Sequence, residues 1–200
     1  MDTNESTSPA GPLAGPLQQV NERCLTLLIQ AARSAQADTF PLVLQLGSVL
    51  REVTPEVRTR AARRSFLLVD LELANGAWWR WVQNHPAREA PLGDRHGSFP
   101  RAAAIPLSRA TLMLAWHAVR AHDQSLCLLG MSPTVAEIVG NLSLTEIDQV
   151  AVRRFRHLRP RWDDHPALWN QLLQSSQTSD IRLNREFCLR ALALSAGVML

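Results

Sequence analysis

The spacing of apolar residues divides most of the chain into amphipathic helices. Between residues 20 and 37 apolar side chains recur every three or four positions, which is typical of a helix with one buried face. Residues 107–122 repeat this spacing and are apolar nearly all round, as expected of a helix packed between others. The run 66–73 (FLLVDLEL) predicts either a helix end or a buried strand. The pattern as a whole indicates a mostly α protein, a bundle of helices.

Capping residues mark where several of these helices begin. Thr54 is a candidate N-cap, with Pro55 at the first helical position. Ser132 is likewise a candidate N-cap, for a helix that continues through residue 139. The stretch from Ser143 to Glu146 has the pattern of a capping box, in which the two side chains satisfy each other's backbone N–H groups.

The segment 132–156 combines two of these helices with a tight turn at Gly140 and Asn141. Ala136 and Gly140 lie four positions apart, so we expect the two helices to approach each other closely there. This pattern predicts a helix-turn-helix, and an ordinary helical hairpin in a bundle remains the alternative.

Composition along the chain predicts a tail, two helical units and a linker. Residues 1–17 are rich in Ser, Thr, Pro and Gly and lack periodicity, which is typical of a disordered tail. Residues 84–106 contain four of the 12 prolines and two glycines, so we expect a linker there. The helical units are then residues 18–83 and 107–200.

The two units show signs of an internal repeat. A buried helix leads to Leu46-Gly47 in the first unit and to Leu129-Gly130 in the second. Each unit also has a Trp ahead of a His-Pro-Ala motif. The further parallels are Thr54-Pro55-Glu56-Val57 with Leu144-Thr145-Glu146-Ile147, and Ala61, Arg63 and Arg64 with Ala151, Arg153 and Arg154. A chain of two repeated units would be a pseudo-dimer.

Composition narrows the classes of protein to consider. With 200 residues, 46% hydrophobic and 20% charged, the chain is of a size and polarity that form a packed core. The three cysteines are far apart and form no CxxC pair, which favours a reducing compartment. No targeting segment or membrane span is evident, so we expect a cytoplasmic protein.

Every one of the 21 basic residues is an arginine, and the formal net charge is +3. Five arginines without an intervening acid follow the second helix of the 132–156 segment, and a second group lies in the first unit. Guanidinium groups fork onto phosphates, so these clusters predict contacts with double-stranded DNA, whereas the alternative is a solvated basic helix face. The candidate DNA-binding residues are Arg153, Arg154, Arg156, Arg159, Arg161, Arg63 and Arg64.

A tryptophan cluster and an apolar C-terminus are the candidates for a partner interface. Clustered tryptophans beside an apolar run predict a core or a subunit interface, and base stacking is the other option. The C-terminal stretch predicts either a docking helix or a core helix. The candidate interface residues are Trp78, Trp79, Trp81, Phe187 and Leu189.

Signs of catalysis are few. The six histidines form no HExxH pair, and Asp163-Asp164-His165 has the pattern of a turn more than of a metal site. No glycine-rich phosphate loop and no GxSxG motif is present. We therefore expect no enzymatic activity, no metal and no cofactor.

Residues 107–173 resemble a known family. Leu128-Leu129-Gly130-Met131, Leu142-Ser143-Leu144, Phe155-Arg156 and Asp163-Asp164-His165 occur there in the order and spacing of the FlhD subunit of the bacterial flagellar master regulator FlhDC. The chain is also similar to distant FlhD/FlhC-type activators of mobile genetic elements. It is longer than a flagellar FlhD and lacks the four-cysteine zinc site of flagellar FlhC, so a fused double FlhD-like unit and a zinc-free divergent partner both remain open.

The resemblance implies a mostly helical transcription activator that acts as a homo- or hetero-oligomer. Its expected partners are an FlhC- or FlhD-like subunit, promoter DNA and RNA polymerase, and its expected location is the cytoplasm, at the nucleoid. A rival hypothesis is an interaction module that regulates another protein without touching DNA. The modest net charge favours this rival.

Overall fold

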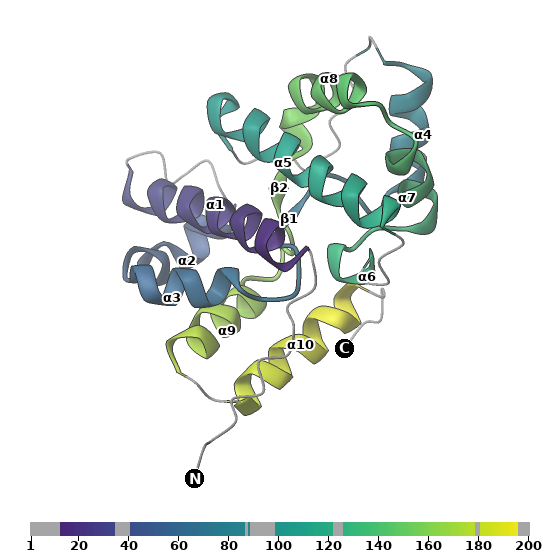
Figure 1. Cartoon of the computed structure of the whole chain (residues 1–200). Coiled ribbons are helices and arrows are strands. Elements are labelled where there is room, and N and C mark those ends of the chain that lie inside the picture. The colour runs from purple at the N-terminus through teal and green to yellow at the C-terminus, as the bar shows by residue number, and fades with distance from the viewer. Residues whose placement is uncertain are drawn as a thin grey trace.

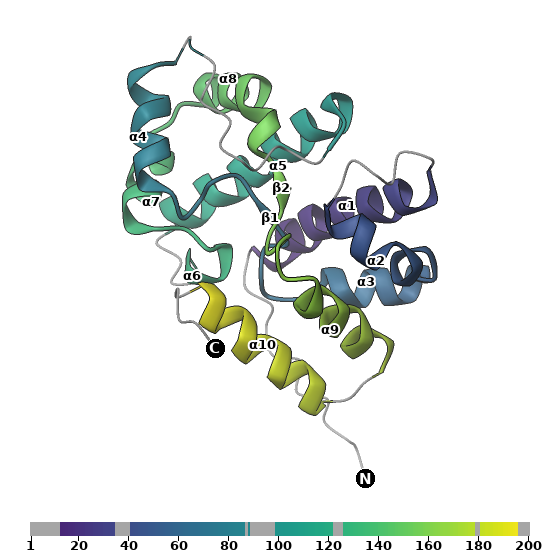
Figure 2. The ribbon, with the colours of Figure 1, turned by 180° about the vertical axis from the view of Figure 1, so that it is seen from behind.

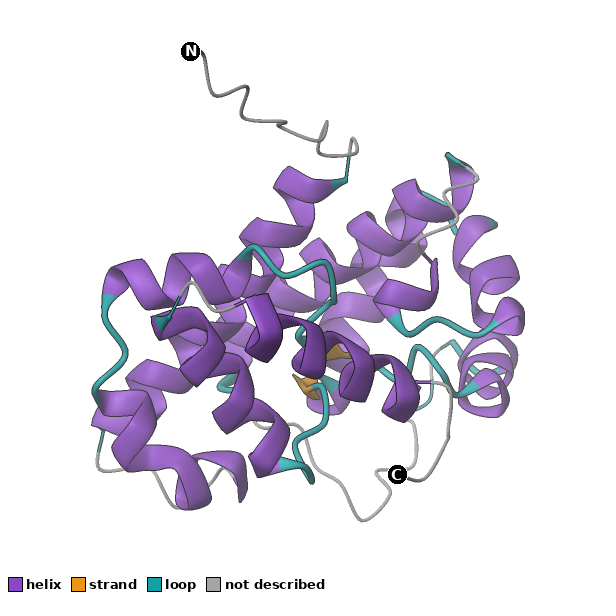
Figure 3. Ribbon diagram, turned by 90° about the horizontal axis from the view of Figure 1, so that it is seen from below, coloured by secondary structure: helices purple, strands orange, loops and turns teal. Residues whose placement is uncertain are grey.

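The computed structural model describes residues 13–34, 41–86, 88, 99–121, 126–178 and 181–195. Helices make up most of these residues (Figures 1 and 3), so the prediction of a mostly α protein is confirmed. The elements are α1 (Ala14–Arg33), α2 (Pro41–Arg51), α3 (Pro55–Ala62), β1 (Val69–Asp70), α4 (Gly76–Asn84), α5 (Arg101–Arg120), α6 (Leu126–Leu129), α7 (Pro133–Gly140), α8 (Leu144–Arg154), η2 (Phe155–His157), β2 (Arg159–Pro160), α9 (Pro166–Gln177) and α10 (Ile181–Ser195).

The two halves of the chain have matching elements in the same order. A 20-residue helix opens each half, α1 in the first and α5 in the second. The hairpin α2–α3 then corresponds to α7–α8, β1 to β2, and α4 to α9. Even the unusual backbone is matched, because Glu72 after β1 and Trp162 after β2 both have a left-handed φ, of 55° and 56°. The structure thus supports the internal repeat.

The short strands β1 and β2 pair the two halves with each other. Val69 pairs with Pro160 and Asp70 pairs with Arg159, in antiparallel orientation. An antiparallel pair has a local twofold axis, which agrees with the matching order of elements in the two halves. Within the run 66–73, residues 69–70 form a strand, most of the flanking residues are buried and none is helical, so the run is not a helix end.

The helix that follows the strand in each half packs against the hairpin of the other half. Helix α9 packs against α2 and α3 of the first half, whereas α4 packs against α7 of the second. Figure 1 shows the resulting lobes, with α1, α2, α3 and α9 in one and α4, α5, α7 and α8 in the other. Viewed from behind in Figure 2, the strand pair lies between them. The two helical units, predicted at 18–83 and 107–200, are therefore interlocked through these helices.

The structure locates the predicted tail and linker more narrowly. Helix α1 begins at Ala14, so the tail predicted at 1–17 is too long, and its first 12 residues lie outside the described part. Helix α5 begins at Arg101 and runs through Pro106, so the end of the predicted linker 84–106 lies inside this helix. The burial of Ala104 and Leu107 stabilises this first part of the helix against the cost of a proline inside it. Of the predicted linker, residues 87 and 89–98 lie outside the described part.

A buried polar side chain fixes the path of the chain from α3 to β1. The amide of Asn21 on α1 donates to the carbonyl of Phe66 at 2.8 Å, and its oxygen accepts from the N–H of Leu68 at 2.8 Å. Asn21 is fully buried, so these bonds satisfy groups that water does not reach. They orient the strand on which the two halves meet.

Helix α10 lies outside the repeat and packs on α9. Its Phe187 is fully buried and meets the ring of Phe66 edge-on at 6.1 Å. None of the helices in the described part is both long and apolar enough to cross a bilayer.

Candidate nucleic-acid interface

The hairpin α7–α8 is built as its sequence predicts. The Ser132 hydroxyl caps α7 by accepting from the N–H of Val135 at 3.3 Å, and Asn141 follows the helix as its C-cap. Ser143 and Glu146 form the predicted capping box, in which the Ser143 N–H donates to the Glu146 carboxylate at 2.8 Å. Both helix starts are therefore fixed by local hydrogen bonds.

Gly140, the small residue at the end of α7, allows a close contact that differs from the predicted one. A Cβ on Gly140 would lie 2.7 Å from Cγ1 of Val119 on α5. The close approach at Gly140 is therefore between α7 and α5, and not between α7 and α8 as we predicted. It holds the hairpin against the long helix of its own half.

Helix α8 buries one side against α5 and exposes the other. Ile147 and Ala151 are buried. Thr145, Gln149 and Arg153 are exposed. Helix α8 also exposes apolar side chains, with Leu144 57% exposed and Val152 45% exposed.

The first half repeats this hairpin with different surface residues. Thr54 caps α3 by accepting from the N–H of Val57 at 3.3 Å. Arg60 on α3 and its C-cap Arg63 are exposed, while Arg58 pairs with Glu22 of α1 at 3.5 Å. Two equivalent hairpins therefore present unlike side chains to solvent.

Three of the candidate DNA-binding arginines lie on the surface. Arg63, Arg153 and Arg156 are exposed. The Arg153 guanidinium donates to the carbonyl of Pro86 at 2.5 Å, and that of Arg156 lies over the Phe155 ring at 5.8 Å. These contacts are at the surface, so the three cations face solvent.

The other four candidate DNA-binding arginines bind groups within the protein. This corrects the expectation that each cluster of arginines forms a basic surface. Arg154, only 1% exposed, donates to the carbonyls of His85 and Arg88. Arg159 forks onto Asp70 at 2.7 Å and Glu72 at 2.8 Å. Arg161 donates to the Leu128 carbonyl at 2.9 Å, and Arg64 donates to the hydroxyls of Ser175 and Ser176. Buried charges need such partners, and sequence alone did not locate the partners.

The candidate interface residues are split between core and surface. Trp79 and Phe187 are core residues, 1% and 0% exposed, so the structure corrects their placement in an interface. Trp78 is half-buried against the His157 ring at 4.7 Å, and Trp81 stacks on the His85 ring at 4.8 Å. Leu189 is 58% exposed.

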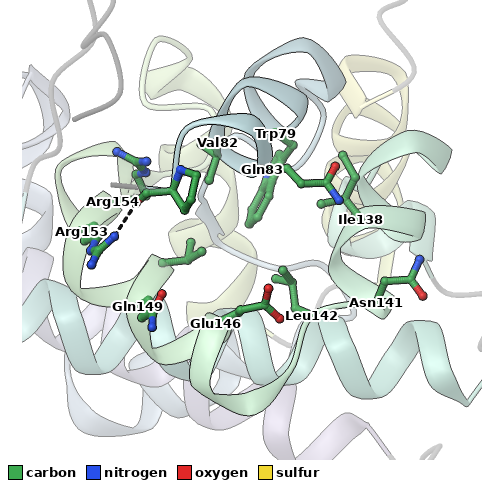
Figure 4. Close-up of a pocket in the computed structure, with 12 residues that line it drawn as sticks. Trp79, Val82, Gln83, Ile138, Asn141, Leu142, Glu146, Gln149, Arg153 and Arg154 are labelled. Carbon is green, nitrogen blue, oxygen red and sulfur yellow. Dashed lines mark hydrogen bonds between the residues drawn. The ribbon is translucent and has the colours of Figure 1, made fainter. Parts of the chain in front are cut away.

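A cavity of about 150 Å³ separates α4 from the α7–α8 hairpin. Figure 4 shows the Trp79 indole extending from α4 into this space, with Arg153, Gln149 and Glu146 of α8 on the opposite side. No pattern in the sequence predicts this cavity, because it depends on a helix from one half meeting a hairpin from the other. Within the described part, no group of three or more His, Cys, Asp or Glu side chains could hold a metal ion.

The outward polar residues of α8 were also missed. The signal for them was present, because Thr145 and Gln149 lie away from Ile147 and Ala151 on a helical projection.

In comparisons with known proteins, the chain matches no protein-family model, no curated protein and no solved structure.

Proposed function

We propose that this protein is a DNA-binding transcriptional regulator that carries two helix-turn-helix-like units in one chain. The observation that supports it best is the pair of matching hairpins, α2–α3 and α7–α8, whose second helices begin at the N-caps Thr54 and Ser143. Helix-turn-helix proteins commonly bind DNA as twofold dimers, one second helix for each half-site. A single chain with unlike hairpins would bind two unlike half-sites.

The surface residues of each hairpin define the proposed contacts. Arg153 and Arg156 beside α8 and Arg63 beside α3 would bind phosphates. Gln149 and Thr145 would face base edges, since a glutamine amide pairs with adenine and hydroxyls bond to several bases. The proposal extends to an activator subunit of an FlhDC-like hetero-oligomer, which would meet an FlhC- or FlhD-like partner and RNA polymerase at promoters in the nucleoid.

The experiment is genome-wide DNA occupancy of the tagged protein, followed by binding to an enriched fragment over a range of salt concentrations. Removing two phosphate contacts with Arg153→Ala and Arg156→Ala lowers the slope of log affinity against log salt by about 2. The matched control is Arg185→Ala with Arg190→Ala, which removes the same charge from exposed positions of α10. An unchanged slope in the first variant contradicts phosphate contact at α8.

One observation favours an interaction module as a second candidate. Leu144 and Val152 expose apolar surface on α8, where a DNA-reading helix would carry mostly polar groups. If this surface binds a protein, Leu144→Ser with Val152→Ser abolishes promoter occupancy, whereas Arg153→Ala with Arg156→Ala preserves both occupancy and salt dependence. The two sets of variants therefore distinguish the candidates.

A further inference from the structure

The cavity between α4 and the α7–α8 hairpin has the size and lining of a small-molecule site. Its volume of about 150 Å³ is that of a protein cavity which accepts one benzene-sized ring. Apolar side chains form its walls, and polar side chains from α8 and the α7–α8 turn stand around it (Figure 4). The apolar lining residues are Trp79, Val82, Pro86, Ile138, Leu142 and Val150.

A buried hydrogen-bond donor in the wall has no acceptor. Trp79 is 1% exposed, and its indole Nε1 finds no partner among the described residues. The indole of Trp78 has the same deficit, but only Trp79 lines the cavity. A buried N–H without an acceptor destabilises a protein, but Nε1 is closed to water, so Trp79 offers the cavity apolar ring surface and not its N–H.

At the equivalent position in the other half, the tryptophan has a hydrogen-bond acceptor. Trp169 of α9 is the counterpart of Trp79, is equally buried, and donates its N–H to the carbonyl of Arg161 at 2.8 Å. Helix α9 continues to Gln177 and packs against both α2 and α3, whereas the shorter α4 ends at Asn84 and packs against α7. The cavity therefore lies where the shorter helix leaves its hairpin partly uncovered.

The charges around the cavity favour an anion. Arg153 is exposed at its edge, and Arg154 forms part of its wall. The single acid there, Glu146, already accepts from the N–H and the hydroxyl of Ser143 at 2.8 and 2.7 Å. These hydrogen bonds and the dipole at the start of α8 thus partly offset the negative charge of Glu146.

We propose that this cavity binds a small aromatic carboxylic acid. The ring would lie between Trp79 and the apolar side chains of α7 and α8, and the carboxylate would meet the guanidinium of Arg153. This inference concerns a small molecule and does not depend on whether the hairpin binds DNA.

The test is calorimetric titration of the full chain with three probes of similar shape. Benzoate carries the charge and the acceptor, benzamide carries an acceptor only, and toluene carries neither. We expect benzoate to bind about tenfold more tightly than benzamide, because a charge-assisted hydrogen bond is about twice as strong as a neutral one. Toluene should bind least tightly.

Variants assign the binding to this cavity. Val150→Phe fills the space and should lower benzoate affinity at least about tenfold while the melting temperature is maintained. Arg153→Gln should lower benzoate affinity about tenfold and leave benzamide affinity unchanged. Arg63→Gln, the matched change in the other half, should alter neither affinity.

The proposal is overturned if benzoate does not bind, if it binds Val150→Phe as tightly as the parent protein, or if toluene binds as tightly as benzoate.

Discussion

Arg64 and Arg154 occupy equivalent positions in the two halves, and each reaches across to the helix that the other half contributes. Arg64 follows α3 and donates to the hydroxyls of Ser175 and Ser176 on α9, at 3.0 and 3.1 Å. Arg154 ends α8 and donates to the carbonyl of His85, the C-cap of α4, at 3.0 Å. Each guanidinium also lies over an aromatic ring, that of Phe187 or Trp81. The two arginines thus fasten the exchanged helices.

This arrangement predicts opposite outcomes for neighbouring arginines. Arg154→Ala should lower the free energy of unfolding by about 2–4 kcal/mol, because it leaves part-buried carbonyls without a donor and a cavity in place of the buried side chain. Arg153→Ala, next to it but exposed, should cost about 0.5 kcal/mol or less. Urea denaturation measures both, and equal losses would contradict the structural role of Arg154.

The same comparison in the first half is the control. Arg64→Ala should destabilise the protein by more than Arg63→Ala does, since Arg64 is half-buried and bonded to α9. The loss at Arg64 should be smaller than at Arg154, because serine hydroxyls left without the arginine still donate to the carbonyl of Leu172. A larger loss at Arg64 would argue against this explanation.

The packing of α7 on α5 gives a second prediction. Gly140→Ala should destabilise the protein by about 1–3 kcal/mol, because the added Cβ would lie 2.7 Å from the stiff, β-branched Val119. Combining it with Val119→Ala should recover part of this loss. Thermal melts of the two single variants and the double variant measure the coupling.

The matched control for that prediction is Gly47 in α2. A Cβ there would meet only the end of the Arg51 side chain, at 4.0 Å. Gly47→Ala should therefore stabilise the protein by up to about 1 kcal/mol, through helix propensity. If both glycine replacements destabilise equally, the close approach at Gly140 is not the cause.

Local features of the fold could be predicted from the sequence, because they depend on residues a few positions apart. The N-caps Thr54, Ser132 and Ser143 are confirmed, as is the end of α7 at Gly140. The parallel of Arg63 and Arg64 with Arg153 and Arg154 is likewise consistent with the positions of these residues in the two halves. The His-Pro-Ala motifs are not equivalent, however, since His85 follows α4 whereas His165 precedes α9.

Features that depend on contacts between the halves could not be predicted. A run of arginines has the same sequence whether it faces solvent or is buried. The carboxylates that pair with the largely buried Arg159 belong to Asp70 and Glu72, in the other half of the chain. The cavity depends likewise on α4 crossing to the second hairpin. Contacts between the halves thus bury Arg159, and the exchanged helices α9 and α4 supply the partners of Arg64 and Arg154.

Stability should fall in mild acid because of His157. Burial lowers the pKa of this imidazole below its ordinary value of 6.5 in the folded protein. As the pH falls below about 6.5, the unfolded chain takes up a proton that the folded protein does not, so the free energy of unfolding decreases by up to about 1 kcal/mol per pH unit. His157→Phe, which keeps a ring against Trp78, should remove this pH dependence between pH 7 and 5.

NMR titration of the His157 ring provides an independent measurement. Its midpoint in the folded protein should lie below that of an unfolded peptide with the same sequence. A midpoint above the peptide value would contradict the expected direction, and the pH dependence would then belong to other groups.

The capping box of α8 predicts a further loss of stability at lower pH. Hydrogen bonds from the backbone and side chain of Ser143 lower the pKa of Glu146 below its ordinary value of 4.5. This contribution is present above about pH 4.5 and is lost as the pH falls through the lower, folded pKa. At neutral pH, Ser143→Ala should cost about 1 kcal/mol, whereas Ser143→Thr keeps the hydroxyl and should cost less. Urea titrations at pH 7 and pH 3 measure the effect: the difference between parent and Ser143→Ala should shrink at pH 3, and an unchanged difference would show that the Glu146 charge does not contribute.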